Sequence, residues 1–198
     1  MPSSSTSVSA PVFVTYPIGS NIIKIIADIK YALKYPKNLF GILLRSVFLG
    51  TENEIKWAFI ENPKNFAPNL YETFLKYSSG NDLIASYYKK IFKDNSKLHS
   101  WIWHDYERIL SQLNPQNYSF QDEKELLKRD GLPNSPFMEL YYIKNNFFMD
   151  DNEILNNVGK ISHIPAYIVQ GRYDLICPPV NAFNLSNKWR SSKITFVN

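Results

Sequence analysis

The chain has 198 residues, of which 44% are hydrophobic and 20% are charged, so its composition is that of a folded protein and not of a disordered one. Its net charge of +4 comes from scattered lysines with no basic stripe or nucleic-acid motif, and we expect no nucleic-acid partner. The single cysteine, Cys177, excludes an internal disulfide framework and indicates a reducing, cytoplasmic location, where it is best interpreted as a small buried residue.

The N-terminal quarter of the chain predicts one helix followed by one strand. Met1 to Thr15 is rich in serine and lacks the basic start and apolar centre of a signal peptide. Asn21 to Tyr35 has apolar residues at helical spacing, and Pro36 stops the pattern. Leu39 to Leu49 is an apolar run that predicts a buried strand. Charged residues interrupt this whole region, so we expect no membrane span.

The middle of the chain predicts a series of amphipathic helices. Turns rich in proline, glycine and asparagine separate them. The predicted helices are Glu52 to Glu61, Pro68 to Tyr77, Asp82 to Phe92, Lys97 to Leu113, Gln121 to Lys128 and Pro136 to Met149.

The most informative segment lies near the C-terminal end. Ile164 to Val169 is short and rich in β-branched residues, which predicts a buried strand, and Gly171 permits a sharp exit from it. Asp174 then lies just beyond the carboxyl end of that strand, at the edge where open α/β sheets bind ligands. A helix over Val180 to Arg190 and a strand over Ile194 to Val197 follow. The predicted fold class is α/β, with a helical insertion between two parts of a sheet.

Several segments resemble the proline iminopeptidase branch of the α/β-hydrolases. They are Tyr31 to Pro36 with Gly41 to Leu49, Glu54 to Trp57 with Leu83 to Lys90, and Gly171 to Pro178. The Gly-Arg-Tyr-Asp sequence in the last segment is the most specific. The resemblance implies a partial α/β-hydrolase sheet with an inserted, mainly helical cap. The implied divisions are an unmatched segment 1–26, core at 27–51, cap at 52–160, and a truncated return to the core at 161–198.

The resemblance implies a serine peptidase that releases N-terminal proline from short peptides, without metal or cofactor. A serine attacks only when a histidine takes its proton, and a carboxylate orients that histidine. Asp174 is the candidate acid of this triad. Ser20 follows Gly19 and is a candidate nucleophile, although the second glycine of Gly-x-Ser-x-Gly is absent and a helix N-cap explains it more simply. The triad histidine has no counterpart, so we expect a truncated or frame-shifted fragment that is inactive alone.

The family's substrate site also differs here. The resemblance implies two glutamates that hold the substrate's charged amine, and this chain has His104 after Trp103 and Lys144 at those positions. A lysine beside an ammonium costs roughly 4 kcal/mol at about 4 Å in an effective dielectric near 20. Asp105 or Glu107 could replace the missing charge, although acidic residues on a helix are more often solvated.

Trp103 also belongs, with Phe147 and Phe148, to the candidate lining of an imino-ring pocket, and core packing is the alternative. Two other functions stay open at this point. One is a different α/β-hydrolase, an esterase or amidase with a changed cap, and the other is a non-catalytic remnant. Because strands such as Leu39 to Leu49 would have exposed edges and faces, we expect the isolated chain to be poorly stable.

Overall fold

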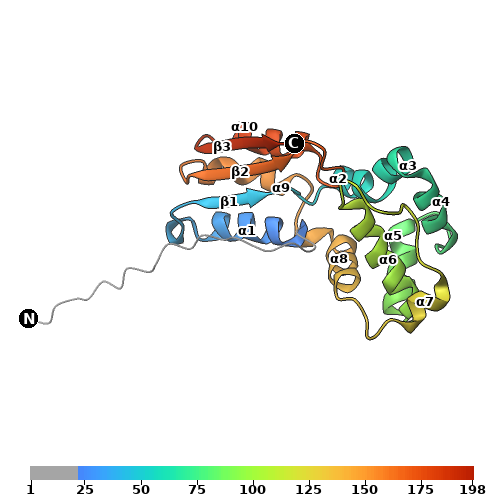
Figure 1. Cartoon of the computed structure of the whole chain (residues 1–198). Helices are drawn as coiled ribbons and strands as arrows, with labels where there is room; N and C mark the ends of the chain where they lie inside the picture. The colour runs from blue at the N-terminus through green and yellow to red at the C-terminus, as the bar shows by residue number, and fades with distance from the viewer. Residues whose placement is uncertain (1–21) are drawn as a thin grey trace, which may run out of the picture.

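The computed structural model describes residues 22–198, in which a small parallel sheet lies beside a large group of helices (Figure 1). The strands are β1 (Ile42–Arg45), β2 (Ala166–Gly171) and β3 (Ser192–Val197), in the order β1-β2-β3. Both pairs are parallel, and Ile168 of the central strand is in register with Leu44 and Ile194. All three strands therefore end at the same edge of the sheet, which faces the helices (Figure 1).

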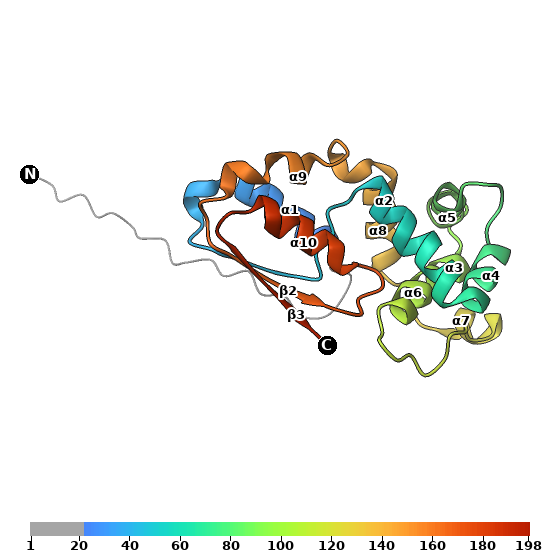
Figure 2. The same ribbon diagram turned by 90° about the horizontal axis from the view of Figure 1, so that it is seen from above.

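One face of the sheet is covered by three helices, α1 (Ile22–Lys34), α9 (Glu153–Asn157) and α10 (Pro179–Lys188) (Figure 2). The apolar stripe of α1 is buried, as its sequence spacing predicts. On the opposite face, Tyr167 of the central strand is 51% exposed. Within residues 22–198, the sheet is thus covered on one side, which agrees with the uncovered apolar face expected from the sequence.

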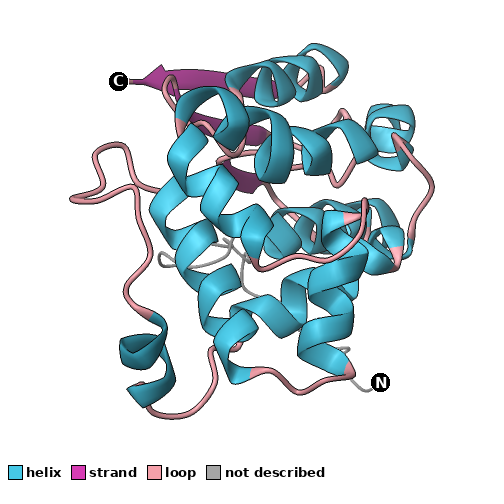
Figure 3. Ribbon diagram, turned by 90° about the vertical axis from the view of Figure 1, so that its right-hand side faces the viewer, coloured by secondary structure: helices cyan, strands magenta, loops and turns pink. Residues whose placement is uncertain are grey.

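The chain between β1 and β2 is mostly helical (Figure 3). Its α-helices before α9 are α2 (Glu52–Lys56), α3 (Asn62–Phe66), α4 (Pro68–Lys76), α5 (Leu83–Phe92), α6 (Lys97–Leu110), α7 (Glu123–Lys128) and α8 (Ser135–Lys144). A π-helical turn, η2 (Trp57–Glu61), joins α2 to α3, and 3-10 turns occur at η3 (Asn146–Phe148) and η4 (Val158–Ile161). A further 3-10 turn, η1 (Pro36–Asn38), precedes β1. Stacked aromatic rings hold this group together, with Phe74 3.7 Å from Tyr106 and 4.3 Å from Tyr87 between ring centroids. None of the helices in the described part of the chain is long and apolar enough to cross a membrane.

The three predicted boundaries that differ most from the structure do so for local reasons. The first strand ends at Arg45 and not at Leu49, because Ser46 has a positive φ of 56° that an extended strand cannot accommodate. The helix predicted over Glu52 to Glu61 continues past Pro63 to Phe66. Proline lacks the N–H that donates a helical hydrogen bond, and the π-helical turn η2 lies directly before it. The helix α8 ends at Lys144, since the next turn contains residues with positive φ.

Candidate functional site

Asp174 lies in the turn after β2, at the carboxyl edge of the sheet, as the sequence predicts. Its Oδ1 accepts a hydrogen bond from the Cys177 amide at 2.9 Å. Burial raises the pKa of Asp174, and hydrogen bonds from Cys177, Ser46, Ile176 and Gln170 oppose that shift by favouring the charged form. The carboxylate is therefore oriented by hydrogen bonds from several sides.

Gln170 joins the turn of Asp174 to the exit of the neighbouring strand. Its side chain is fully buried, and its Oε1 accepts from the Val47 amide at 3.0 Å. Its Nε2 donates to the Cys177 carbonyl at 2.8 Å and lies 3.4 Å from Oδ2 of Asp174. Gln170 was not among the residues predicted from the sequence. The only signal was a polar side chain inside an apolar strand, which is costly unless it is fully hydrogen-bonded.

The helical group is tied directly to the same turn. The indole N–H of Trp57 donates to the carbonyl of Leu175 at 2.7 Å. Burial raises the pKa of the Cys177 thiol well above its ordinary value, and the negative charges of Asp174, Glu54 and Glu107 add to this effect. Cys177 is 5% exposed, which confirms the interpretation of a small buried residue.

Two carboxyl groups, Glu107 of α6 and Glu139 of α8, interact electrostatically. Glu139 is fully buried, its Oε2 accepts from the indole N–H of Trp103 at 2.8 Å, and its Oε1 has no hydrogen-bond partner among residues 22–198. Burial raises the pKa of Glu139 well above its ordinary value, and the charge of Glu107 raises it further. Burial also raises the pKa of Glu107, whereas the hydrogen bond from the Ser111 hydroxyl and the positive charge of Arg108 lower it. The pair therefore favours retaining a proton or gaining a cation.

Asp105 is not solvated, contrary to the expectation for an acidic residue on a helix. Its side chain is 3% exposed, and Arg129 forms a bidentate pair with it at 2.9 and 2.8 Å. Its neighbour His104 is half-buried and lies 2.9 Å from the hydroxyl of Ser135 through Nδ1. Burial lowers the pKa of His104, so the imidazole favours the neutral form. Asp105 thus forms ion pairs with Arg129 and, at 3.7 Å, with Arg108, whereas Glu107 forms no ion pair within the described part of the chain.

The aromatic candidates for a substrate pocket separate into different environments. Trp103 is fully buried and stacks on Phe59 at 4.9 Å, so it belongs to the core of the helical group. Phe147 is 2% exposed and packs against Phe48, whereas Phe148 is 55% exposed. Lys144 lines a separate cavity of about 430 Å³ that also contains acidic residues. The structure therefore does not bring these rings together around one point.

The remaining candidates bear on the nucleophile, the base and metals. Ser20 lies outside the described residues. His163 is exposed in the segment that precedes β2, at the opposite end of that strand from Asp174. Among residues 22–198, no group of three or more histidine, cysteine, aspartate or glutamate side chains could hold a metal ion.

Comparison with known proteins gives consistent relatives, although no family model matches the chain. A proline iminopeptidase of Arabidopsis thaliana is 29% identical over 177 residues, covering 84% of this chain and 45% of the relative. A probable proline iminopeptidase of Leptolyngbya boryana is 28% identical, with 86% and 54% covered, and a proline iminopeptidase of Neisseria gonorrhoeae is 30% identical, with 86% and 55% covered. The chain spans about half the length of these relatives. Over most of its length, the chain is therefore related in sequence to the proline iminopeptidases.

Proposed function

We propose that the chain forms the acid-bearing and substrate-recognising part of a serine aminopeptidase that releases N-terminal proline from peptides. The observation that carries this proposal is the position of Asp174. It follows the central strand at the carboxyl edge of a parallel sheet, and the helical group contacts its turn through Trp57. A carboxylate at such an edge can orient a histidine and stabilise its cation, which is the role of the acid in a serine triad.

In this proposal the sheet belongs to an α/β-hydrolase core, formed by residues 27–51 and 161–198, and residues 52–160 are its cap. Asp174 supplies one of the three triad roles, and Ser20 is the candidate in the sequence for the nucleophile. Loss of a nucleophile or base typically lowers the rate by about six orders of magnitude, because the triad acts as a unit. We therefore expect the 198-residue chain to be inactive by itself.

We further infer that Glu107 and Glu139 receive the substrate's ammonium group in place of the glutamates missing at positions 104 and 144. Two observations support this inference: Glu139 has an unpartnered buried oxygen, and the negative charge of Glu107 raises the pKa of Glu139 further. A buried carboxylate pair is stabilised by a cation. Asp105 is less suited, since Arg129 already neutralises it.

A second candidate function is that of an esterase or amidase of the same fold. The observation that favours it is Lys144, an exposed cation where the resemblance implies an amine-binding glutamate. A lysine there would disfavour a substrate with a free N-terminal ammonium and would tolerate an uncharged one.

The deciding experiment measures hydrolysis of prolyl and alanyl p-nitroanilides and of p-nitrophenyl acetate. It compares the 198-residue chain with the full product of its gene. We expect the longer product to hydrolyse prolyl p-nitroanilide. In that product, Asp174→Asn should lower kcat by about four orders of magnitude. Glu107→Gln should raise KM, whereas the exposed control Glu125→Gln should leave KM unchanged. Hydrolysis of the ester without any prolyl amide would establish the second candidate instead.

A further inference from the structure

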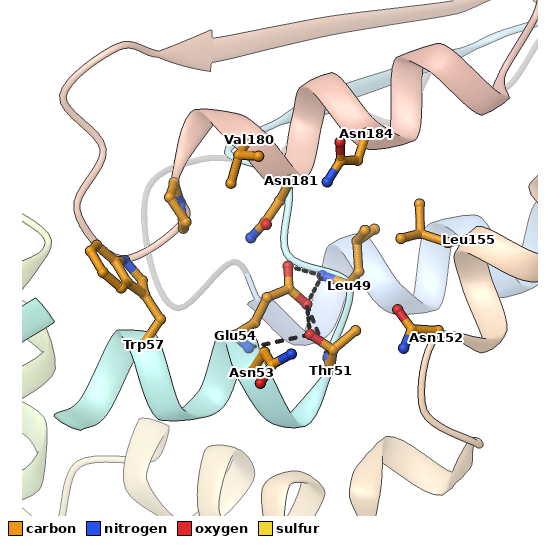
Figure 4. A pocket seen from close by; sticks show the side chains of 11 residues that line it. Leu49, Thr51, Asn53, Glu54, Trp57, Asn152, Leu155, Val180, Asn181 and Asn184 are labelled. Carbon is orange, nitrogen blue, oxygen red and sulfur yellow. Dashed lines mark hydrogen bonds between the residues drawn. The ribbon is translucent and has the colours of Figure 1, made fainter. Parts of the chain in front are cut away.

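A pocket of about 380 Å³ lies between α2, α9 and α10, next to the segment that follows Asp174 (Figure 4). Its volume is within the range of small-ligand sites. Its apolar wall includes Leu49, Leu155 and Val180, and the ring of Trp57 closes one end. Nothing in the amine recognition or the triad chemistry proposed above uses this space.

Asparagine supplies most of the polar side chains that line the pocket, and the Nδ2 of Asn152 donates to Asp151 at 2.6 Å. Asn53 comes from α2, Asn152 from the residue before α9, and Asn181 and Asn184 from α10. The Nδ2 of Asn181 is buried and has no hydrogen-bond partner in the described part of the chain. Figure 4 shows its side chain pointing from α10 into the pocket, toward Glu54. A buried donor without a partner is costly, and a ligand acceptor would satisfy it.

The charges around the pocket exclude a strongly ionic ligand. The carboxylate of Glu54 accepts hydrogen bonds from the Leu49 amide at 3.0 Å, the Thr51 amide at 2.9 Å and the Thr51 hydroxyl at 3.0 Å. It is therefore satisfied without a cation, while its charge disfavours an anion. No lysine or arginine is among the residues lining the pocket. The complementary ligand is neutral, with both donors and acceptors and an apolar part.

We propose that this pocket binds a short stretch of peptide backbone with one apolar side chain. An asparagine amide carries a donor and an acceptor side by side, which matches the carbonyl and N–H of a peptide unit. Asn181 would donate to a peptide carbonyl, and the apolar side chain would lie against Leu155 and Val180. The preference for a peptide over another neutral ligand rests in part on the proposed function. The pocket's edge at Pro178 lies in the same loop as Asp174.

The test uses a dipeptide amide, N-acetyl-alanyl-leucinamide, whose blocked N-terminus prevents it from acting as an aminopeptidase substrate. Its affinity for the 198-residue chain is measured by ¹⁵N chemical-shift titration, with the Trp57 indole and the asparagine side-chain amides as reporters. We expect Asn181→Leu to weaken binding at least tenfold. Asn53 is exposed, and we expect Asn53→Leu to weaken binding several-fold. Asn187→Ala is the matched control, because Asn187 is exposed on α10 and does not line the pocket.

Saturable binding that is lost in Asn181→Leu and retained in Asn187→Ala supports the pocket, even if no peptide is hydrolysed. If Asn181→Leu fails to give a folded spectrum, Asn53→Leu decides by the same criterion. Equal binding by the wild type and both pocket variants would overturn the proposal. Binding of methyl glucoside at these reporters, without binding of the peptide, would overturn it as well. A blocked peptide that binds while prolyl amides are never cleaved would reject only the proposed function.

Discussion

The buried carboxyl of Glu139 gives the sharpest prediction, because its protonation state is linked to folding. The substitution Glu139→Gln keeps the size of the side chain and removes its titration. In the wild type, burial and the charge of Glu107 raise the folded-state pKa of Glu139 well above the ordinary value of 4.5. We therefore expect the wild-type chain to lose stability, relative to Glu139→Gln, as the pH rises.

The sign and size follow from proton linkage. Between pH 4.5 and the folded pKa, the folded chain binds this proton more tightly than the unfolded chain does. The stabilisation from Glu139 is thus fully present below its unfolded pKa and is lost as the pH rises through its folded pKa. Each pH unit within that window costs on the order of 1 kcal/mol for one proton. Because Glu107 interacts with Glu139, this proton belongs to the pair.

The assay is urea denaturation of both chains at about pH 4.5, 5.5 and 6.5. The free energy of unfolding of Glu139→Gln minus that of the wild type should increase at each step to a higher pH. Glu125→Gln is the control, because the Glu125 side chain is 56% exposed and pairs with Lys128, and its difference from the wild type should not grow with pH. A difference for Glu139→Gln that is flat, or that falls as the pH rises, would show that Glu139 is ionised in the folded chain and would refute the reasoning.

Three further predictions test packing elsewhere. Arg129→Met should lower the free energy of unfolding by about 2–4 kcal/mol, because it removes the bidentate partner of the buried Asp105 and leaves only Arg108, at 3.7 Å, beside that charge. Asp105→Asn in the same chain should restore part of the loss. A loss below about 1 kcal/mol in urea denaturation would contradict this. Gly50→Ala should lower the free energy of unfolding by about 1–3 kcal/mol, because φ at this position is 74° and the new Cβ would lie 2.6 Å from Cε of Met149. Gly131→Ala is the control: φ is 64° there, but no atom lies within 4 Å of the new Cβ, so the loss in the same assay should be smaller. Iodoacetamide should label Cys177 slowly in the native chain and rapidly in urea, because the thiol is buried and its pKa is raised. Mass spectrometry measures both labelling rates, and fast labelling of the native chain would disprove the burial.

Elements with strong local signals were predictable from the sequence. The helix α1 follows the isoleucine spacing from Ile22 and ends before Pro36. The central strand β2 and the turn at Gly171 follow from the β-branched run before them, and so Asp174 could be placed at the sheet edge. The boundaries that failed depended on backbone conformations, such as the positive φ of Ser46, that a serine in a sequence does not signal.

The sequence by itself determined the α/β class, the helical insertion, the relationship to proline iminopeptidases and the position of Asp174 on its strand. Only the tertiary structure decided which polar side chains share an environment. Glu107 and Glu139 form a pair because α6 and α8 pack together, and Gln170 holds the Asp174 turn because β1 ends beside it. Such contacts join residues far apart in the chain, and the local propensities that shape helices and strands carry no information about them.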